Sequence, residues 1–161
     1  MEWERYGRLV REYDALLAYA MQQSSALVGL RFVERRLTYA EKIFVKMIGH
    51  AITLRNISPD PERKVPQELW DASSAASIAR CIIEAHEALT YIALGTTDLL
   101  EQEFRIMLWE LHDAVRRMKI ADAMGLTGRK PQEMMETVRK RKEALVQHPL
   151  NRPGIRGGQL V

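Results

Sequence analysis

Two stretches of the sequence carry an arginine followed by a histidine, a pair of side chains that could act on a phosphate. In the first stretch Arg80 precedes His86, and Glu84 lies between them. An arginine binds phosphate oxygens through a planar set of donors, and a histidine can act as an acid or a base near neutral pH. The pair would therefore suit a nuclease. The alternative is a core helix that happens to contain a histidine.

The helical periodicity of this first stretch favours the core interpretation. At 100° per residue, the Arg80 and His86 side chains diverge by about 120°. Arg80 and Glu84 lie on one face, whereas His86 falls on the opposite, apolar face with Ala75, Ile78, Ala79, Ile82, Leu89 and Ala93. We therefore expect His86 to be buried, with one ring nitrogen hydrogen-bonded.

The second stretch places more polar side chains on one side of a helix. Arg105 and His112 are seven residues apart, so they lie two turns apart on the same side. Glu101, Trp109 and Arg116 share that side. It borders an expected core stripe of Leu100, Phe104, Leu108, Leu111, Val115 and Met118.

Two interpretations of these polar residues stay open. One is an interhelical ion-pair network, in which Arg105 or Arg116 pairs with Glu84 while Trp109 packs between helices. The other is a ligand-binding or catalytic cleft. A small-molecule pocket lined by Tyr91, Arg105 and Trp109 is one form of that cleft.

Both arginine–histidine pairs resemble the R-x4–6-H motif of the HEPN class of small helical ribonucleases. That resemblance implies that the arginine and the histidine act on the phosphate and the 2′-hydroxyl of RNA. On this hypothesis Arg105 and His112 carry the chemistry, with Arg80 and Glu84 as support. The sequence departs from the usual pattern at Cys81, because HEPN proteins usually have a polar residue after the arginine.

Apolar residues recur at three- and four-residue spacing over long segments, as amphipathic helices require. Such segments predict helices over 3–28, 30–57, 71–94, 97–124 and 131–148. Asp71 and Thr97 are the expected N-caps of the third and fourth helices, and Pro131 is the expected first residue of the fifth. The prolines of residues 58–67 predict a linker.

These helices and their short connections predict an all-α fold, an antiparallel bundle of about five helices. We expect one bundle domain over residues 1–148 and an extended or mobile tail over 149–161, where glycine and proline are frequent. No pattern typical of a β-strand was found in the sequence.

Composition and charge limit the classes of function. The 161 residues are 47% hydrophobic, and the net charge is +3. Residues 1–128 are nearly neutral, whereas the segment 129–156 is basic, so RNA contact through that segment is an alternative. The charges of the N-terminal residues are not those expected of a signal peptide, and Cys81 is the single cysteine. We expect a soluble cytoplasmic protein that does not enter a membrane.

The basic run of residues 139–142 is spread around the whole circumference of a helix, so most of its side chains should be solvated. An RNA contact aided by Arg129, Lys130, Arg152 and Arg156 is the alternative.

Metal and cofactor chemistry finds little support. A ferritin-type di-iron bundle needs Glu-x-x-His on two helices, and that sequence does not occur. Each of four predicted helices carries one histidine, namely His50, His86, His112 and His148. Phosphate-binding glycine loops and nucleophile elbows are missing from the sequence as well. We expect neither a metal nor a cofactor.

Part of the sequence resembles an uncharacterised family of all-helical bacterial proteins, known as a domain of unknown function. The resemblance covers about residues 40–150 and includes the short segment 142–151. It is carried by Ser74, Arg80, Glu84, Tyr91, Ile92, Glu103, Phe104, Arg105, Leu108, Trp109 and Arg116 or Arg117. The family implies no activity for this chain, and neither His86 nor His112 belongs to its pattern.

The first hypothesis is therefore a non-enzymatic bacterial protein that associates with itself or with a protein partner. The second is a HEPN-like ribonuclease or RNA-binding protein of a toxin or phage-defence type. The candidate binding residues are Arg80, Glu84, Tyr91, Arg105, Trp109, His112 and Arg116.

Overall fold

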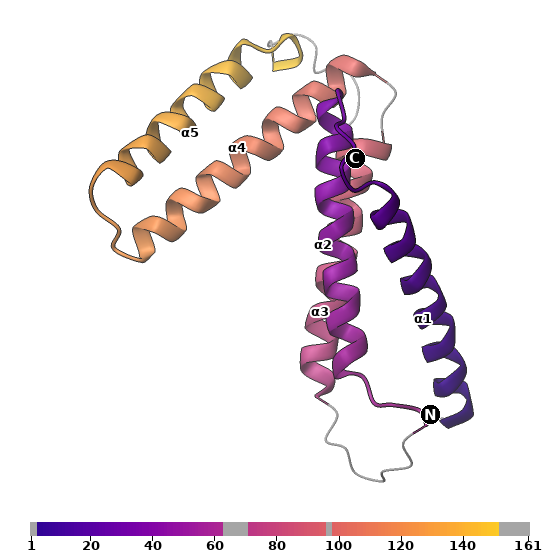
Figure 1. Ribbon diagram of the computed structural model, residues 1–161. Coiled ribbons are helices and arrows are strands. Elements are labelled where there is room, and N and C mark those ends of the chain that lie inside the picture. Colours follow the sequence, from indigo (N-terminus) through magenta and orange to yellow (C-terminus); the bar gives the residue numbers. More distant parts are fainter. Residues whose placement is uncertain (1–2, 63–70, 96–97, 152–161) are drawn as a thin grey trace. The chain divides into compact units, whose positions relative to one another are not determined.

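The computed structural model describes residues 3–62, 71–95 and 98–151, and these residues form five α-helices and no β-strand (Figure 1). The all-α prediction is confirmed. Two compact units are present, Met1–Leu94 and Gly95–Val161. Consecutive helices run antiparallel within each unit. The domain boundary expected at residue 148 stays a prediction, and residues 152–161 of the expected tail lie outside the described residues.

The first unit contains α1 (Trp3–Ala26), α2 (Arg35–Ile57), α3 (Ala72–Leu89) and a π-helical turn, η1 (Thr90–Leu94). α2 packs against both α1 and α3. The expected start of the second helix at residue 30 is wrong, because α2 begins at Arg35. Gly29 has a φ of 85° in the preceding turn, and Val33 is 99% exposed, so no packing surface draws this segment into a helix.

α3 begins where the sequence predicts. The Asp71 carboxylate accepts hydrogen bonds from the backbone N–H groups of Ser73, at 3.1 Å, and Ser74, at 3.0 Å, as an N-cap does. The hydroxyls of the same two serines also donate to this carboxylate, and together these bonds hold the pKa of Asp71 below its ordinary value.

The buried side of α3 is lined by small residues. Ala75 and Ala85 are buried there, and small side chains let helix axes approach closely. The following turn adds Ile92, which is 0% exposed and is the only fully buried large side chain among the described residues. The core of this unit therefore lies where α2 meets α3 and η1.

α1 is held by polar side chains that reach distant backbone carbonyls. Trp3 Nε1 donates to the oxygen of Pro61 at 3.1 Å, and Tyr6 Oη donates to the oxygen of Pro59 at 2.7 Å. Farther along the helix, Tyr13 Oη donates to the oxygen of Ala51 at 2.9 Å. These bonds fasten α1 to α2 and to the segment that follows it.

An ion pair adds to this attachment. Arg55 Nε on α2 donates to Asp14 Oδ1 on α1 at 2.7 Å. The hydrogen bond to Asp14 raises the pKa of Arg55. Burial raises the pKa values of Tyr6 and Tyr13, because the neutral phenol tolerates loss of water better than the phenolate does.

The second unit contains α4 (Leu99–Ala123), α5 (Arg129–Gln147) and a short 3₁₀ helix, η2 (Pro149–Asn151). Asp98 is the N-cap of α4 and accepts from the N–H of Leu100 at 2.9 Å. The expected cap Thr97 lies outside the described residues. α5 begins at Arg129 after Gly128, two residues before the predicted Pro131.

The buried side of α4 differs from the predicted stripe. Its buried residues are Gln102, Ile106, Ala114 and Ala121. The predicted core residues Leu100 and Leu108 are 42% and 39% exposed, and the other members of that stripe are only partly covered. The reason is that α5 packs on the neighbouring side of α4. No residue of α5 is buried.

Two contacts tie the hairpin of α4 and α5 together. Arg141 Nη1 donates to the backbone oxygen of Glu110 at 2.7 Å. At the end of α5, His148 is buried with its ring 5.2 Å from that of Phe104, centroid to centroid. The N–H of Leu150 donates to His148 Nδ1 at 3.3 Å.

Candidate functional site

The candidate residues of the first unit form an exposed pair on α3. Arg80 Nε lies 2.9 Å from Glu84 Oε1, four residues along the helix, and the two side chains are 80% and 59% exposed. Exposed pairs of this spacing contribute little to stability because water screens them. Tyr91, in the π-helical turn, is 38% exposed. Nothing in this geometry encloses a reacting group.

His86 does not lie in the core. Its side chain is exposed, whereas its neighbour Ala85 is buried. The expectation of a buried, hydrogen-bonded histidine is therefore wrong. The side of α3 that packs on α2 is turned toward Ala85 and Ile92, and this leaves His86 at the edge of the apolar face.

The candidate residues of the second unit share one side of α4, as their spacing predicts. At 100° per residue, Arg105, Trp109, His112 and Arg116 fall within an arc of about 60°. This arc is on the opposite side of the helix from the buried residue Ala114. Lys119 extends the same arc, although the sequence analysis did not single it out.

Arg105 is engaged within its own helix. Its Nε donates to Glu101 Oε1 at 3.0 Å, and Nη2 contacts the same oxygen. The arginine side chain is 20% exposed. Trp109 is partly buried, while His112, Arg116 and Lys119 are exposed. We call His112, Arg116 and Lys119 the basic strip of α4.

The basic strip carries side chains that can attract an anion. A general acid or base works best when a neighbouring group orients it and water is excluded. His112 is open to solvent. In the described part of the chain, no group of three or more His, Cys, Asp or Glu residues could hold a metal ion.

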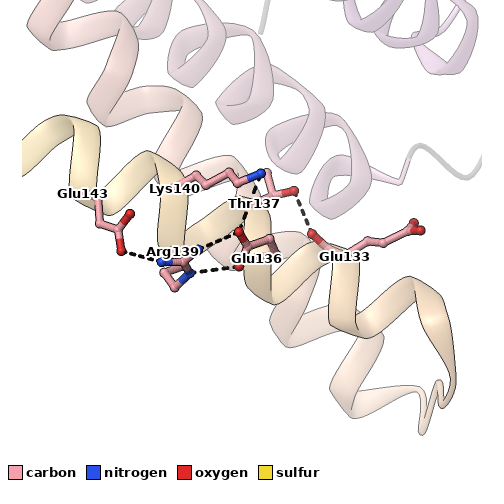
Figure 2. A network of polar contacts seen from close by, with 6 residues as sticks. All are labelled: Glu133, Glu136, Thr137, Arg139, Lys140 and Glu143. Carbon is pink, nitrogen blue, oxygen red and sulfur yellow. Dashed lines mark hydrogen bonds and ion pairs between the residues drawn. The ribbon is translucent and has the colours of Figure 1, made fainter.

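Two bases of the basic run of α5, Arg139 and Lys140, pair with acids on the same helix (Figure 2). Arg139 bridges two glutamates, with Nη2 2.7 Å from Glu136 Oε1 and Nη1 2.8 Å from Glu143 Oε1. Lys140 Nζ also lies 3.6 Å from Glu136 Oε1. The ion pair with Arg139 lowers the pKa of Glu136 and raises that of Arg139.

The remaining bases of α5 are divided between pairing and solvent. Arg129 Nε lies 2.6 Å from Glu133 Oε1, and Arg141 reaches back to α4. A phosphate chain would have to compete with these contacts. The predicted RNA contacts Arg152 and Arg156 lie outside the described residues.

Comparison of the chain with protein-family models, with curated proteins and with solved structures finds no match. The resemblances to the uncharacterised helical family and to HEPN proteins therefore stay predictions. None of the described helices has the length and hydropathy needed to cross a bilayer.

Sequence reasoning missed two features that the structure brings out. One is the attachment of α1 through Trp3 and Tyr6, for which aromatic donors three residues apart and the carbonyls of Pro59 and Pro61 were the available signal. The other is His50, whose Nε2 is buried without a hydrogen-bond partner. Nothing in the spacing of apolar residues distinguishes His50 from the other histidines.

Proposed function

We propose that this protein works by association with other protein chains through the apolar helix faces that its own fold leaves uncovered. The observation that carries the proposal is the apolar stripe of α4. Leu100 and Leu108 are 42% and 39% exposed in a stripe where a core would be expected, and its other members are only partly covered. Large exposed apolar patches are typical of interaction sites.

The size of the second unit supports the same proposal. A helix hairpin offers each helix a single partner, so a helix with two apolar sides cannot bury both. α5 packs on α4 through contacts such as Arg141 with Glu110, and it leaves the stripe half covered. Burial of that stripe would be favourable by about 25 cal/mol for each Å² removed from water.

A second uncovered surface lies on α1. Leu9, Leu16 and Tyr19 are 49%, 69% and 62% exposed. α1 packs on α2 through the side that carries Val10. The protein therefore carries more apolar helix surface than its described contacts cover, in both units.

Sedimentation of the full chain tests the proposal. We expect the weight-average mass to rise above the chain mass of 18.5 kDa as the concentration is raised through the micromolar range. A single species of chain mass at several hundred micromolar would contradict self-association. The cytoplasmic setting and membership of the helical family belong to the proposal and rest on the sequence alone.

RNA binding by a HEPN-like mechanism is the second candidate, and the basic strip of α4 is what favours it. The ion pairs of Arg139 and Lys140 on α5 weigh against it. End-labelled structured RNA at low salt, incubated with the wild type and with His112→Ala, tests the idea. His86→Ala is the matched control, because it removes an exposed histidine from α3. Cleavage that is lost only in His112→Ala would support a ribonuclease. If the wild type neither cleaves nor retains the RNA, RNA is excluded as a partner.

A further inference from the structure

The apolar stripe of α4 has the spacing of a coiled-coil seam. Phe104, Leu108, Leu111, Val115 and Met118 follow one another at intervals of four, three, four and three residues. This alternation keeps the apolar side chains of a helix facing a second helix along its whole length when the two helices cross at a small angle. The stripe is therefore shaped to receive another long helix.

The same seam is nearly symmetric about its centre. When two such helices run antiparallel around an axis between Leu108 and Leu111, each Leu108 faces Leu111 of the second copy. Phe104 then faces Val115 of the second copy, so that a large side chain meets a smaller one in each outer layer and two leucines meet in each central layer. This match follows from the order of the residues alone.

Charges at the ends of the seam also match in that register. Asp98 and Glu101 lie at the start of α4, and Lys119 lies near its end on the same flank as Glu101. Antiparallel pairing brings Lys119 opposite Asp98 and Glu101 of the second copy. Parallel pairing would instead place Lys119 at the level of Lys119 of the second copy, far from the acids at the start of α4.

We propose that the α4 stripe is a homodimer interface, in which a second copy of this chain packs its own α4 antiparallel across Leu108 and Leu111. This proposal rests on the proposed function, because it names the partner and the surface of that association. The uncovered surface of α1 is not part of the interface.

A pair of glutamate substitutions locates the interface. Leu108→Glu places a charge in the seam, and Leu16→Glu makes the same change at an exposed leucine of α1, 69% exposed. In sedimentation we expect the wild type and Leu16→Glu to reach twice the chain mass, while Leu108→Glu stays at the chain mass. Because Leu108 is already 39% exposed, the circular dichroism of the Leu108→Glu variant should keep the wild-type helical signal.

The outcomes separate the two proposals. A wild type that stays monomeric overturns the α4 homodimer and self-association in general, and leaves only association with a different protein. A wild-type dimer that survives Leu108→Glu, or one that Leu16→Glu dissociates, overturns the α4 interface and leaves association in place.

Charge reversal tests the register with changes that do not threaten folding. Lys119→Glu would bring three acids together at each end of the seam, and we expect the dimer dissociation constant to rise about 5- to 30-fold at low salt. Lys46→Glu on α2 is the matched control and should leave the constant unchanged. An equal effect of both variants would mean that net charge, rather than the register, is responsible.

Spin labels read the orientation directly. In a Cys81→Ser background, which removes the exposed native thiol, a label at Lys119→Cys reports the distance between its two copies. Antiparallel pairing predicts about 30 Å, because positions 119 and 100 lie at one level and the helix rises 1.5 Å per residue. A distance below about 20 Å would indicate parallel helices and overturn the proposal.

Discussion

In the unit Met1–Leu94, the side chains of Trp3, Tyr6 and Tyr13 reach backbone carbonyls at least 38 residues away. In the unit Gly95–Val161, most of the described ion pairs join residues three or four apart on one helix. Hydrogen bonds to distant carbonyls fix one helix against another, because they form only when the two helices are in the native arrangement. Ion pairs within one helix stabilise that helix without positioning it.

The difference shows where each unit gains its tertiary specificity. The first unit combines a fully buried isoleucine with several long-range polar contacts. The second buries Ile106 and two alanines of α4 and adds the contact from Arg141 to Glu110. The second unit is also the one whose most apolar stripe is left half covered.

The largest expected effect is at the core of the first unit. Ile92→Ala should lower the free energy of unfolding by about 2–5 kcal/mol, because it leaves a cavity beside α2. Ile83→Ala removes the same atoms from a side chain that is 59% exposed and should cost less than about 1 kcal/mol. Urea unfolding and hydrogen exchange at α2 and α3 amides measure both. Equal losses would mean that η1 does not hold the core.

The next effect concerns the tie within the second unit. Arg141→Ala removes the hydrogen bond to the Glu110 oxygen and should destabilise the packing of α5 on α4 by about 1–2 kcal/mol. Lys142→Ala, at the exposed neighbouring position, is the control and should change little. Hydrogen exchange at α4 and α5 amides measures the loss. Unchanged protection in Arg141→Ala would show that apolar contacts alone hold the hairpin.

A smaller effect is expected where α1 is fastened. Tyr6→Phe deletes the hydroxyl that donates to Pro59 and should cost about 0.5–1.5 kcal/mol. Tyr19→Phe changes a tyrosine that is 62% exposed and should be close to neutral. Exchange rates of α1 amides compare the two variants. If both behave alike, the long-range bond is not what positions α1.

The smallest and most selective effect is on the dependence of stability on pH. The pKa values of Tyr6 and Tyr13 are raised in the folded unit, mainly by burial, so the folded state keeps protons that the unfolded chain releases. Their contribution is fully present below the unfolded pKa of about 10 and is lost as pH rises through the folded value. We expect α1 to loosen at alkaline pH.

Tyrosinate absorbance and α1 exchange would follow this loosening. In the variant Tyr6→Phe/Tyr13→Phe, the exchange rates of α1 amides should no longer rise at alkaline pH. The absorbance of the remaining tyrosines should still change as they ionise. The unit Gly95–Val161 contains no tyrosine and serves as the internal reference. An identical alkaline response in the double variant would contradict the assignment.

Parts of the candidate site were predictable from the sequence. Helical spacing correctly placed Arg105, Trp109, His112 and Arg116 on one side of α4, because residues three and four apart are neighbours on any helix. The pairing of Arg105 with Glu101 follows from the same spacing. The burial of His86 was wrongly predicted, since it depends on how α3 is turned against α2.

The sequence by itself determined that the chain is helical and where α3 begins, because apolar periodicity and the Asp71 cap act over one or two turns. Only the tertiary structure decided which apolar sides are covered. α4 carries the predicted stripe, yet α5 packs beside it, on the side of Ala114 and Ala121. Periodicity tells which residues share a side of a helix, whereas burial requires a neighbour on that side, and that neighbour is supplied by contacts between distant parts of the chain.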